Sequence, residues 1–157
     1  MTDFAIRAAR PDEAAQLSEL AQRSKAHWGY DAAFLEACRE ELTLAPGQIT
    51  ERRTQVAVSR EPDTDGALLG FGTIEGEPPA GELGMLFVDP SAIGAGVGGA
   101  LFTHLGELAL RLGFRRLTIA SDPNAEPFYL ARGAVRIGGV PSGSVPGRVL
   151  PLLALAL

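Results

Sequence analysis

The chain has 157 residues and a formal net charge of −5 at neutral pH. No block of lysines or arginines stands out, and a surface that binds nucleic acid usually needs one, so we expect no nucleic-acid partner. The single cysteine, Cys38, excludes an intrachain disulfide, and two histidines far apart in the sequence, His27 and His104, argue against a metal site. The length suits one domain, residues 1–157, with a core of its own.

Neither end of the chain has the pattern of a membrane segment. The first residues lack the basic and then apolar layout of a signal peptide, and the apolar stretch at 149–157 is too short to cross a bilayer. We therefore expect a cytoplasmic protein without a membrane partner.

The first part of the chain predicts one strand and two helices. Alternating apolar residues at 4–8 predict a half-buried strand. Pro11 and the two acidic residues after it open a helix, since proline suits the first helical position and acids favour the helix dipole. Asp31 is a good N-cap for a second helix, and Cys38 on its apolar stripe is expected to be a small core residue.

The rest of the chain predicts six more strands and two more helices. Strands are predicted at 55–59 and 68–74 on either side of a hairpin loop, residues 75–81 are predicted to be a Pro/Gly loop, and Glu82 opens a central strand. After the central helix come strand 117–120, a short helix, strand 135–138, a loop at 141–148 and a closing strand at 149–157, in which Pro151 favours an edge or a bulge.

These elements follow the order β-α-α-β-β-β-α-β-α-β-β. Such an order predicts an α/β (α+β) fold, with a mixed central sheet of about seven strands and four helices on both faces.

Residues 82–112 carry the strongest functional signal. A strand-length apolar run is broken by Asp89-Pro90, and a glycine-rich turn at 94–99 then leads into an amphipathic helix. Glycine lets the backbone approach a ligand, and the free N–H groups at a helix start attract anions, so a pyrophosphate suits this turn. The Gly-Lys-Ser/Thr of a P-loop and the spacing of a dinucleotide fingerprint are absent, and a merely flexible turn is the alternative.

Two stretches resemble the signatures of the GNAT superfamily of N-acetyltransferases. Val88-Asp89-Pro90 followed by Gly94-Ala95-Gly96-Val97-Gly98-Gly99 is similar to its acetyl-CoA motif, V-x-P and then [R/Q]-G-x-G-x-[G/A]. Pro123-Asn124 with Tyr129 and Gly133 is similar to its second signature. The chain departs from the first motif at Ile93, where the family has Arg or Gln, and this removes a side-chain contact but no backbone donor.

The resemblance implies direct transfer of an acetyl group from acetyl-CoA to an amine of a small molecule or a peptide. It implies that Asn124 contacts the pantetheine arm and that Tyr129 protonates the departing thiolate. The alternatives are a helix cap for Asn124 and a core aromatic for Tyr129. The residues expected to bind the cofactor are Phe87, Val88, Ile93, Gly94, Ala95, Gly96, Val97, Gly98, Gly99, Asn124 and Tyr129.

The acceptor needs a base, because an alkylamine with a pKa near 10 is mostly protonated at neutral pH, at a cost of roughly 4 kcal/mol. Glu82 is the carboxylate of the central strand and is the candidate catalytic base through a water; a solvated strand-end residue is the alternative. Glu75 and Glu77 are weaker candidates. Backbone N–H groups around Phe87 and Val88 are expected to meet the oxyanion.

The acceptor is expected to contact His27, Trp28 and Tyr30, although aromatic groups that only fill the gap between two helices are the alternative. Arg148 and Ser144 could engage an acidic or polar acceptor or be ordinary loop residues. Two other functions stay open, a non-catalytic acyl-CoA-binding domain and a protein-interaction module. The apolar closing strand is compatible with a homodimer.

Overall fold

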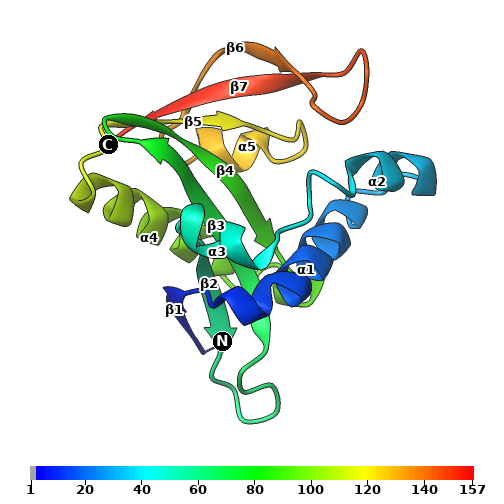
Figure 1. The fold of residues 1–157 in the computed structure, drawn as a ribbon, viewed down its shortest axis with the longest axis vertical. Helices are drawn as coiled ribbons and strands as arrows, with labels where there is room; N and C mark the ends of the chain where they lie inside the picture. Colours follow the sequence, from blue (N-terminus) through cyan, green and yellow to red (C-terminus); the bar gives the residue numbers. More distant parts are fainter. Residues whose placement is uncertain (1–2) are drawn as a thin grey trace.

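Seven strands form one sheet within residues 3–157, the part of the chain that this computed structural model describes (Figure 1). The strands are β1 (Phe4–Ala8), β2 (Gln55–Ser59), β3 (Leu68–Glu77), β4 (Ala80–Val88), β5 (Arg116–Ala120), β6 (Val135–Pro141) and β7 (Val149–Ala156). Their order across the sheet is β1-β2-β3-β4-β5-β7-β6. Neighbours are antiparallel except β4 and β5, which run parallel.

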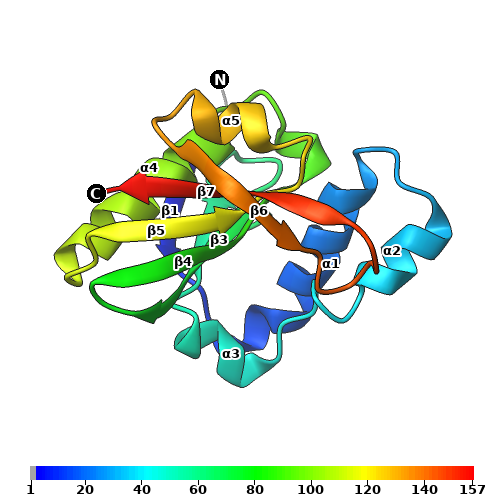
Figure 2. The same ribbon diagram turned by 90° about the horizontal axis from the view of Figure 1, so that it is seen from above.

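Helices cover both faces of the sheet, which confirms the predicted mixed α+β fold (Figure 2). They are α1 (Ala14–Ala26), α2 (Ala32–Cys38), α3 (Pro46–Glu51), α4 (Val97–Arg111) and α5 (Glu126–Leu130), with short 3-10 turns η1 (Pro11–Glu13) and η2 (Pro90–Ala92). Helix α3 was not predicted, because six residues are too few for a periodic pattern. Its start is nevertheless marked by Pro46 and by Gln48, whose side chain accepts a hydrogen bond from the Ala45 N–H at 2.8 Å.

Each face of the sheet has its own hydrophobic layer. Leucines of α1 pack with Val56, Phe71 and Met85 on one face, and Leu105 of α4 packs with Ile74 on the other. A Cβ on Gly72 would lie 2.5 Å from Leu105 Cδ1, so the missing side chain lets α4 lie close to β3. The layers therefore fix both α1 and α4 against the central strands.

Strands β4 and β5 pair only at their beginnings. The pairing joins Ala80–Glu82 to Arg116–Thr118 and then stops, and the two strands diverge (Figure 1). A bulge between β3 and β4 accompanies the divergence: the Met85 N–H donates to the Thr73 hydroxyl at 2.9 Å instead of to a strand carbonyl. Among residues 3–157, no strand pairs with residues 83–88 on the β5 side, so the backbone of β4 has no strand partner along that edge.

The segment 75–81 is not the predicted loop. Strand β3 runs on to Glu77 and β4 begins at Ala80, so only Pro78-Pro79 form the turn. Gly76 pairs with Gly81 across the hairpin, which shows that sheet pairing overrides the low strand propensity of glycine. Glu75 is consequently a strand residue directly opposite Glu82.

Pro151 does not mark an edge strand, because β7 lies between β5 and β6. The Pro151 carbonyl accepts from the Ser121 N–H at 2.9 Å, one residue beyond the end of β5. If residue 151 had an N–H, it would point toward β5 as its carbonyl does. Strand β5 has already ended at that level, so the proline removes no hydrogen bond of the β5–β7 ladder. The edge strand at this end of the sheet is β6.

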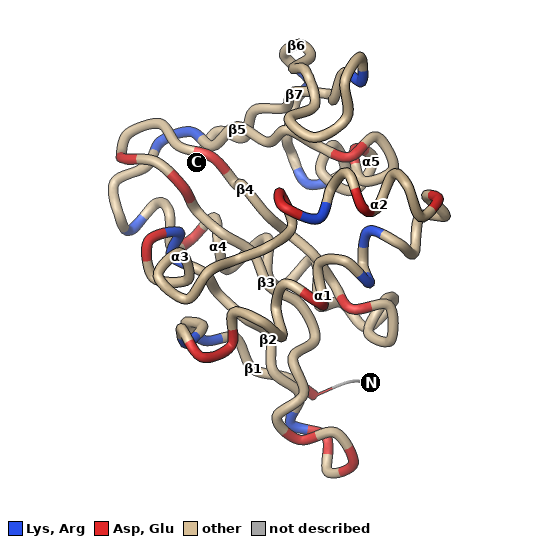
Figure 3. The backbone as a smooth tube through the Cα atoms, turned by 45° about the vertical axis from the view of Figure 1, so that its right-hand side comes forward, with Lys and Arg blue, Asp and Glu red and all other residues tan. Residues whose placement is uncertain are grey.

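Charged residues of both signs are spread over the described chain (Figure 3). None of the helices in residues 3–157 is long and apolar enough to span a membrane.

Candidate active site

The turn between η2 and α4 has the conformation that its glycines allow. Gly94 has φ +86° and Gly96 has φ +82°, the left-handed region that side chains disfavour. A Cβ built on either residue meets nothing within 4 Å, so both face open space. Gly96 is the N-cap of α4, and the turn therefore presents bare backbone at a helix start.

Five backbone N–H groups in this turn have no acceptor within residues 3–157. They belong to Gly94, Gly96, Val97, Gly98 and Gly99, whereas the Ala100 N–H already donates to the Gly96 carbonyl at 3.1 Å. We call these five groups the amide cradle. Unpaired donors at the positive end of a helix dipole fit a pyrophosphate. Val97 is only 1% exposed, backbone included, so its N–H is less accessible than those of the glycines.

Arg132 lies beside the cradle, and the sequence analysis missed it. A Cβ on Gly99 would be 3.1 Å from Arg132 Nη2, so the guanidinium packs on the first turn of α4. Its carbon Cζ lies 3.8 Å from the ring centroid of Phe128, and Nη1 donates to the Phe128 carbonyl at 3.1 Å. Ile93, in contrast, is 53% exposed.

Tyr129 lies in the core on α5, packed edge-on against Phe128 and tilted against Phe102. Its hydroxyl has no hydrogen-bond partner among the described residues. The hydroxyl oxygen is nevertheless accessible to solvent, because Thr54 Oγ1 is the one solvent-inaccessible side-chain oxygen or nitrogen there without a partner. Burial raises the pKa of Tyr129, and the negative charge of Asp122 raises it further. The hydroxyl thus keeps its proton at neutral pH.

The carboxylates of the β3–β4 hairpin differ in their surroundings. Glu82 is exposed and accepts no hydrogen bond from residues 3–157. Glu75 is held by the Thr73 hydroxyl at 2.8 Å, with Arg52 Nε 4.0 Å away. Its carboxylate lies over Gly84, where an added Cβ would overlap Glu75 Oε2. Paired residues of a ladder share a face, so both acids lie on the face opposite α4.

A cluster of charged and aromatic side chains lies past the end of β5. We call Lys25, Tyr30, Asp122 and Arg148 the charged cluster. Asp122 accepts from Lys25 Nζ at 2.7 Å and from the Tyr30 hydroxyl at 2.9 Å, and Arg148 Nη2 donates to that hydroxyl at 2.7 Å. Asn124 joins it by donating from Nδ2 to the Tyr30 hydroxyl at 3.0 Å.

The cluster is preorganised by its own electrostatics. Burial raises the pKa of Asp122, but the hydrogen bonds from Lys25, the Asn124 N–H and Tyr30 outweigh it, so the pKa of Asp122 is lowered. Burial and the hydrogen bond to Asp122 raise the pKa of Tyr30. Asn124 does not cap α5, whose N-cap is Ala125, and its side-chain oxygen keeps its acceptor capacity.

The acetyltransferase (GNAT) domain family matches residues 16–141. The chain belongs to this family. An N-acetyltransferase from Rhodopseudomonas palustris is 23% identical, with TM-score 0.79, and the match covers 100% of this chain and 98% of that one. The PaiA N-acetyltransferase of Thermoplasma acidophilum, whose structure holds coenzyme A, is 17% identical with TM-score 0.76, and 99% of each chain is covered. The search of curated proteins gives no match.

YncA of Salmonella typhimurium, solved with acetyl-CoA, is 21% identical with TM-score 0.66, and 99% of this chain and 94% of that one are covered. Acetyl-CoA is the co-substrate of GNAT enzymes, and its phosphates belong to the class of anion that unpaired N–H groups at a helix start attract. The exposed edge of β4 runs from Leu83 to Val88 and leads directly toward the cradle.

The remaining predicted site residues of this GNAT domain fall into two groups. Tyr30 belongs to the charged cluster, whereas His27 and Trp28 form an exposed edge-to-face pair with ring centroids 6.1 Å apart. Cys38 is buried, with its sulfur 3.5 Å from Ser144 Oγ, as a core residue would be. His104 is partly buried, and its Nε2 lies 2.9 Å from Gln55 Oε1.

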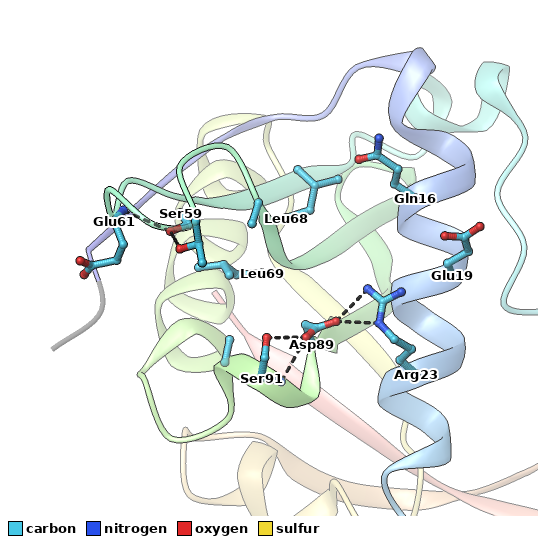
Figure 4. Close-up of a pocket in the computed structure, with 12 residues that line it drawn as sticks. Gln16, Glu19, Arg23, Ser59, Glu61, Leu68, Leu69, Asp89 and Ser91 are labelled. Carbon is cyan, nitrogen blue, oxygen red and sulfur yellow. Dashed lines mark hydrogen bonds and ion pairs between the residues drawn. The ribbon is translucent and has the colours of Figure 1, made fainter.

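A separate cavity of about 490 Å³ lies between α1, the β2–β3 loop and the start of η2 (Figure 4). Arg23 crosses it to pair with Asp89, with Nη2 2.8 Å from Oδ1, and Asp89 also accepts from the Ser91 N–H. None of the residues of the amide cradle or the charged cluster lines this cavity. The Arg23–Asp89 pair fixes α1 to the turn that precedes the cradle.

Proposed function

We propose that this chain transfers the acetyl group of acetyl-CoA directly to an amine of a small molecule or a peptide. The observation that carries the proposal is the amide cradle: five unpaired N–H groups at the start of α4, next to an unpaired edge of β4. Every α-helix leaves its first N–H groups without an internal partner, and at the start of α4 no side chain caps them, so water or a ligand must accept from them. When bound, acetyl-CoA supplies an activated thioester.

The backbone of β4 supports the proposed oxyanion contact. The Asp89 N–H donates to the Leu69 carbonyl at 2.8 Å, and in an antiparallel ladder such bonds alternate along the strand. The Phe87 N–H therefore belongs to β3, whereas the N–H groups of Leu86 and Val88 face the β5 side. We assign the oxyanion contact to these two donors, which are preorganised because the strand holds them.

Tyr129 is the proposed acid. Its raised pKa keeps the hydroxyl protonated, and the hydroxyl has no competing partner among the described residues, so it can donate to a departing thiolate. Its rigid packing against Phe102 and Phe128 holds the oxygen in place.

The base is proposed to be a carboxylate of the β3–β4 hairpin acting through water. Glu82 is the residue expected from the sequence, but Glu75 has the better support, because Thr73 orients its carboxylate and Gly84 makes room for it. Comparing Glu75→Gln with Glu82→Gln separates them. The variant that loses the base lowers kcat by roughly 100-fold and flattens its rise with pH, whereas the other stays near wild type.

Arg132 is proposed to supply the cation that Ile93 does not. Its guanidinium packs on Gly99 beside the cradle, and a phosphate held by the cradle gains a charge-assisted partner there. The rest of the guanidinium is fixed by Phe128, which reduces the entropy lost on binding.

Calorimetric titration with acetyl-CoA tests the proposed function, with ATP and NAD as controls. Micromolar binding of acetyl-CoA alone, followed by thiol release in the presence of amines, is the expected result. Binding without thiol release for any amine would favour an acyl-CoA-binding domain. Absence of binding would overturn the proposal and point to a protein-interaction module.

A further inference from the structure

The positive charges of the charged cluster outnumber its negative charges. Lys25 and Arg148 contribute two positive charges and Asp122 one negative charge, which leaves a formal charge of +1. These side chains are only 12%, 18% and 11% exposed, so water screens the excess poorly. On the open surface, water would screen an excess charge of +1. In this largely buried cluster, a bound anion would stabilise it.

The spare hydrogen-bonding capacity of the cluster is all on its cations. Asp122 already accepts from Lys25, Tyr30 and both nitrogens of Asn124. Arg148 uses only Nη2 within residues 3–157, so its Nε and Nη1 keep their N–H groups for another acceptor. Lys25 likewise donates one bond and carries three donors.

Aromatic packing fixes the plane of the Arg148 guanidinium. Its Cζ lies 4.7 Å from the ring centroid of Phe34, and Phe34 stacks on Tyr30 with centroids 4.0 Å apart. A guanidinium held by its face presents its edge, and the edge is the geometry that binds a carboxylate through two parallel bonds. A carboxylate also balances the excess charge of +1, whereas a phosphate dianion would leave a negative charge in the same place.

The cluster lies on the β5 side of the divergence between β4 and β5. Asp122 is the second residue after the end of β5, and Asn124 of the second signature donates to the Tyr30 hydroxyl. The negative charge of Asp122 is felt at Tyr129. Glu82 is the last β4 residue that pairs with β5, at the closed end of the divergence, and Glu75 lies opposite it on β3. The negative charge of these two carboxylates suits an ammonium group.

We propose that the acceptor is an amine that also carries a carboxylate, bound with that carboxylate at Arg148 and Lys25 and its amine toward the β3–β4 hairpin. This inference rests on the proposed acetyl transfer and names its substrate class. A free amino acid has this chemistry, and so does a peptide with an acidic side chain close to its N-terminal amine.

The test compares acceptors that differ only in the carboxylate. Thiol release is measured with the proteinogenic amino acids, with the carboxamide of each, and with short peptides that begin with an acidic residue or its amide. We expect at least one acid to exceed its own amide by roughly tenfold or more in kcat/KM, because a charge-assisted pair is lost in the amide. The arm in which the preference occurs identifies a free amino acid or a peptide as the source.

Variants of Arg148 test whether this residue causes the preference for the acid over its amide. Arg148→Gln should lower the ratio of acid to amide by roughly 10- to 100-fold, and Arg148→Lys should restore part of it. Arg60→Gln, at the exposed pair with Asp3, is the matched control and should leave the ratio unchanged. The affinity for acetyl-CoA is measured in parallel.

Two failures are distinguishable. If acetyl-CoA binds and amides are acetylated as well as acids in the wild type, the carboxylate proposal is wrong and acetyl transfer stands. If acetyl-CoA does not bind and no amine releases thiol, the proposed function is wrong and the acceptor proposal falls with it. An acid preference that survives Arg148→Gln undiminished would also overturn the assignment to this cluster.

Discussion

The amide cradle and the charged cluster are two binding regions built in opposite ways. The cradle consists of backbone N–H groups from residues adjacent in the chain, and its glycines contribute the absence of side chains. The charged cluster consists of side chains from α1, the turn before α2, the end of β5 and the β6–β7 loop, with Tyr30 and Arg148 separated by 118 residues. The comparison teaches that a site made of backbone is specified locally, whereas a site made of side chains is specified by the whole fold.

Tyr129 belongs to neither region, and as the proposed acid it is the residue whose substitution, Tyr129→Phe, should have the largest effect. We expect kcat to fall by roughly 100-fold or more with the acetyl-CoA affinity unchanged, because only the proton donor is removed. Steady-state kinetics and calorimetry on the same preparation measure both. The chain's other tyrosine is the matched control: Tyr30→Phe should raise KM for the acceptor more than it lowers kcat. Equal kcat in Tyr129→Phe and wild type would remove Tyr129 from the mechanism.

Gly96→Val should break the cradle. A valine at φ +82° strains the backbone by about 1–2 kcal/mol and places a side chain in the space that faces the phosphate. We expect acetyl-CoA binding to weaken by roughly 100-fold or more in calorimetry. Gly106→Ala, in the middle of α4 with its nearest neighbour 3.9 Å away, should bind normally and be slightly more stable. Unchanged affinity in Gly96→Val would show that the phosphates lie elsewhere.

Asp122→Asn should break the charged cluster. Lys25 and Arg148 would lose their shared anion, and we expect a loss of about 3 kcal/mol in the free energy of unfolding at neutral pH. The folded-state pKa of Asp122 is lowered, so its contribution is present above the unfolded pKa near 3.9 and is lost as the pH falls through the folded value. The difference in the free energy of unfolding between the two proteins should therefore begin to shrink below about pH 4 and close only below the folded-state pKa of Asp122. Asp63→Asn, on the exposed β2–β3 loop, is the control, and a gap that persists in acid would contradict the assignment.

Arg132→Gln should have the smallest effect. It tests how far the amide cradle, a site made of backbone, depends on a side chain beside it. We expect acetyl-CoA to bind roughly tenfold more weakly, with a smaller dependence on salt, since one charge-assisted contact is removed. Arg111→Gln, at the other end of α4, is the control for loss of one positive charge. If both variants bind alike, the cradle needs no help from Arg132.

The cradle could be predicted from the sequence because its requirements are local. The glycine-rich stretch after Asp89-Pro90 predicted a turn and a helix start, and the structure has both, with Gly94 and Gly96 at positive φ in the turn. Strand and helix order followed from periodicity in the same way, except where elements were short, as in α3, or where pairing overrode propensity, as at Gly76 and Gly81.

The charged cluster could not be predicted, because no pattern links Lys25 to Asp122 or Tyr30 to Arg148 before the sheet brings them together. The sequence pattern pointed to Tyr30 and, as one alternative, to Arg148. It pointed equally to His27 and Trp28, which lie outside the cluster. The placement of Glu75 over Gly84 could not be predicted for a related reason: it depends on the bulge in β4, and a bulge leaves no clear sequence signal.

Trp28 is the only tryptophan of the chain and is 47% exposed, three residues after Lys25 and two before Tyr30. Its intrinsic fluorescence therefore reports on the connection between α1 and α2 without a label. Arrival of an acceptor at the charged cluster should change the emission of Trp28. The chain thus carries a built-in optical probe of acceptor occupancy, usable in stopped-flow experiments to time acceptor binding separately from thiol release.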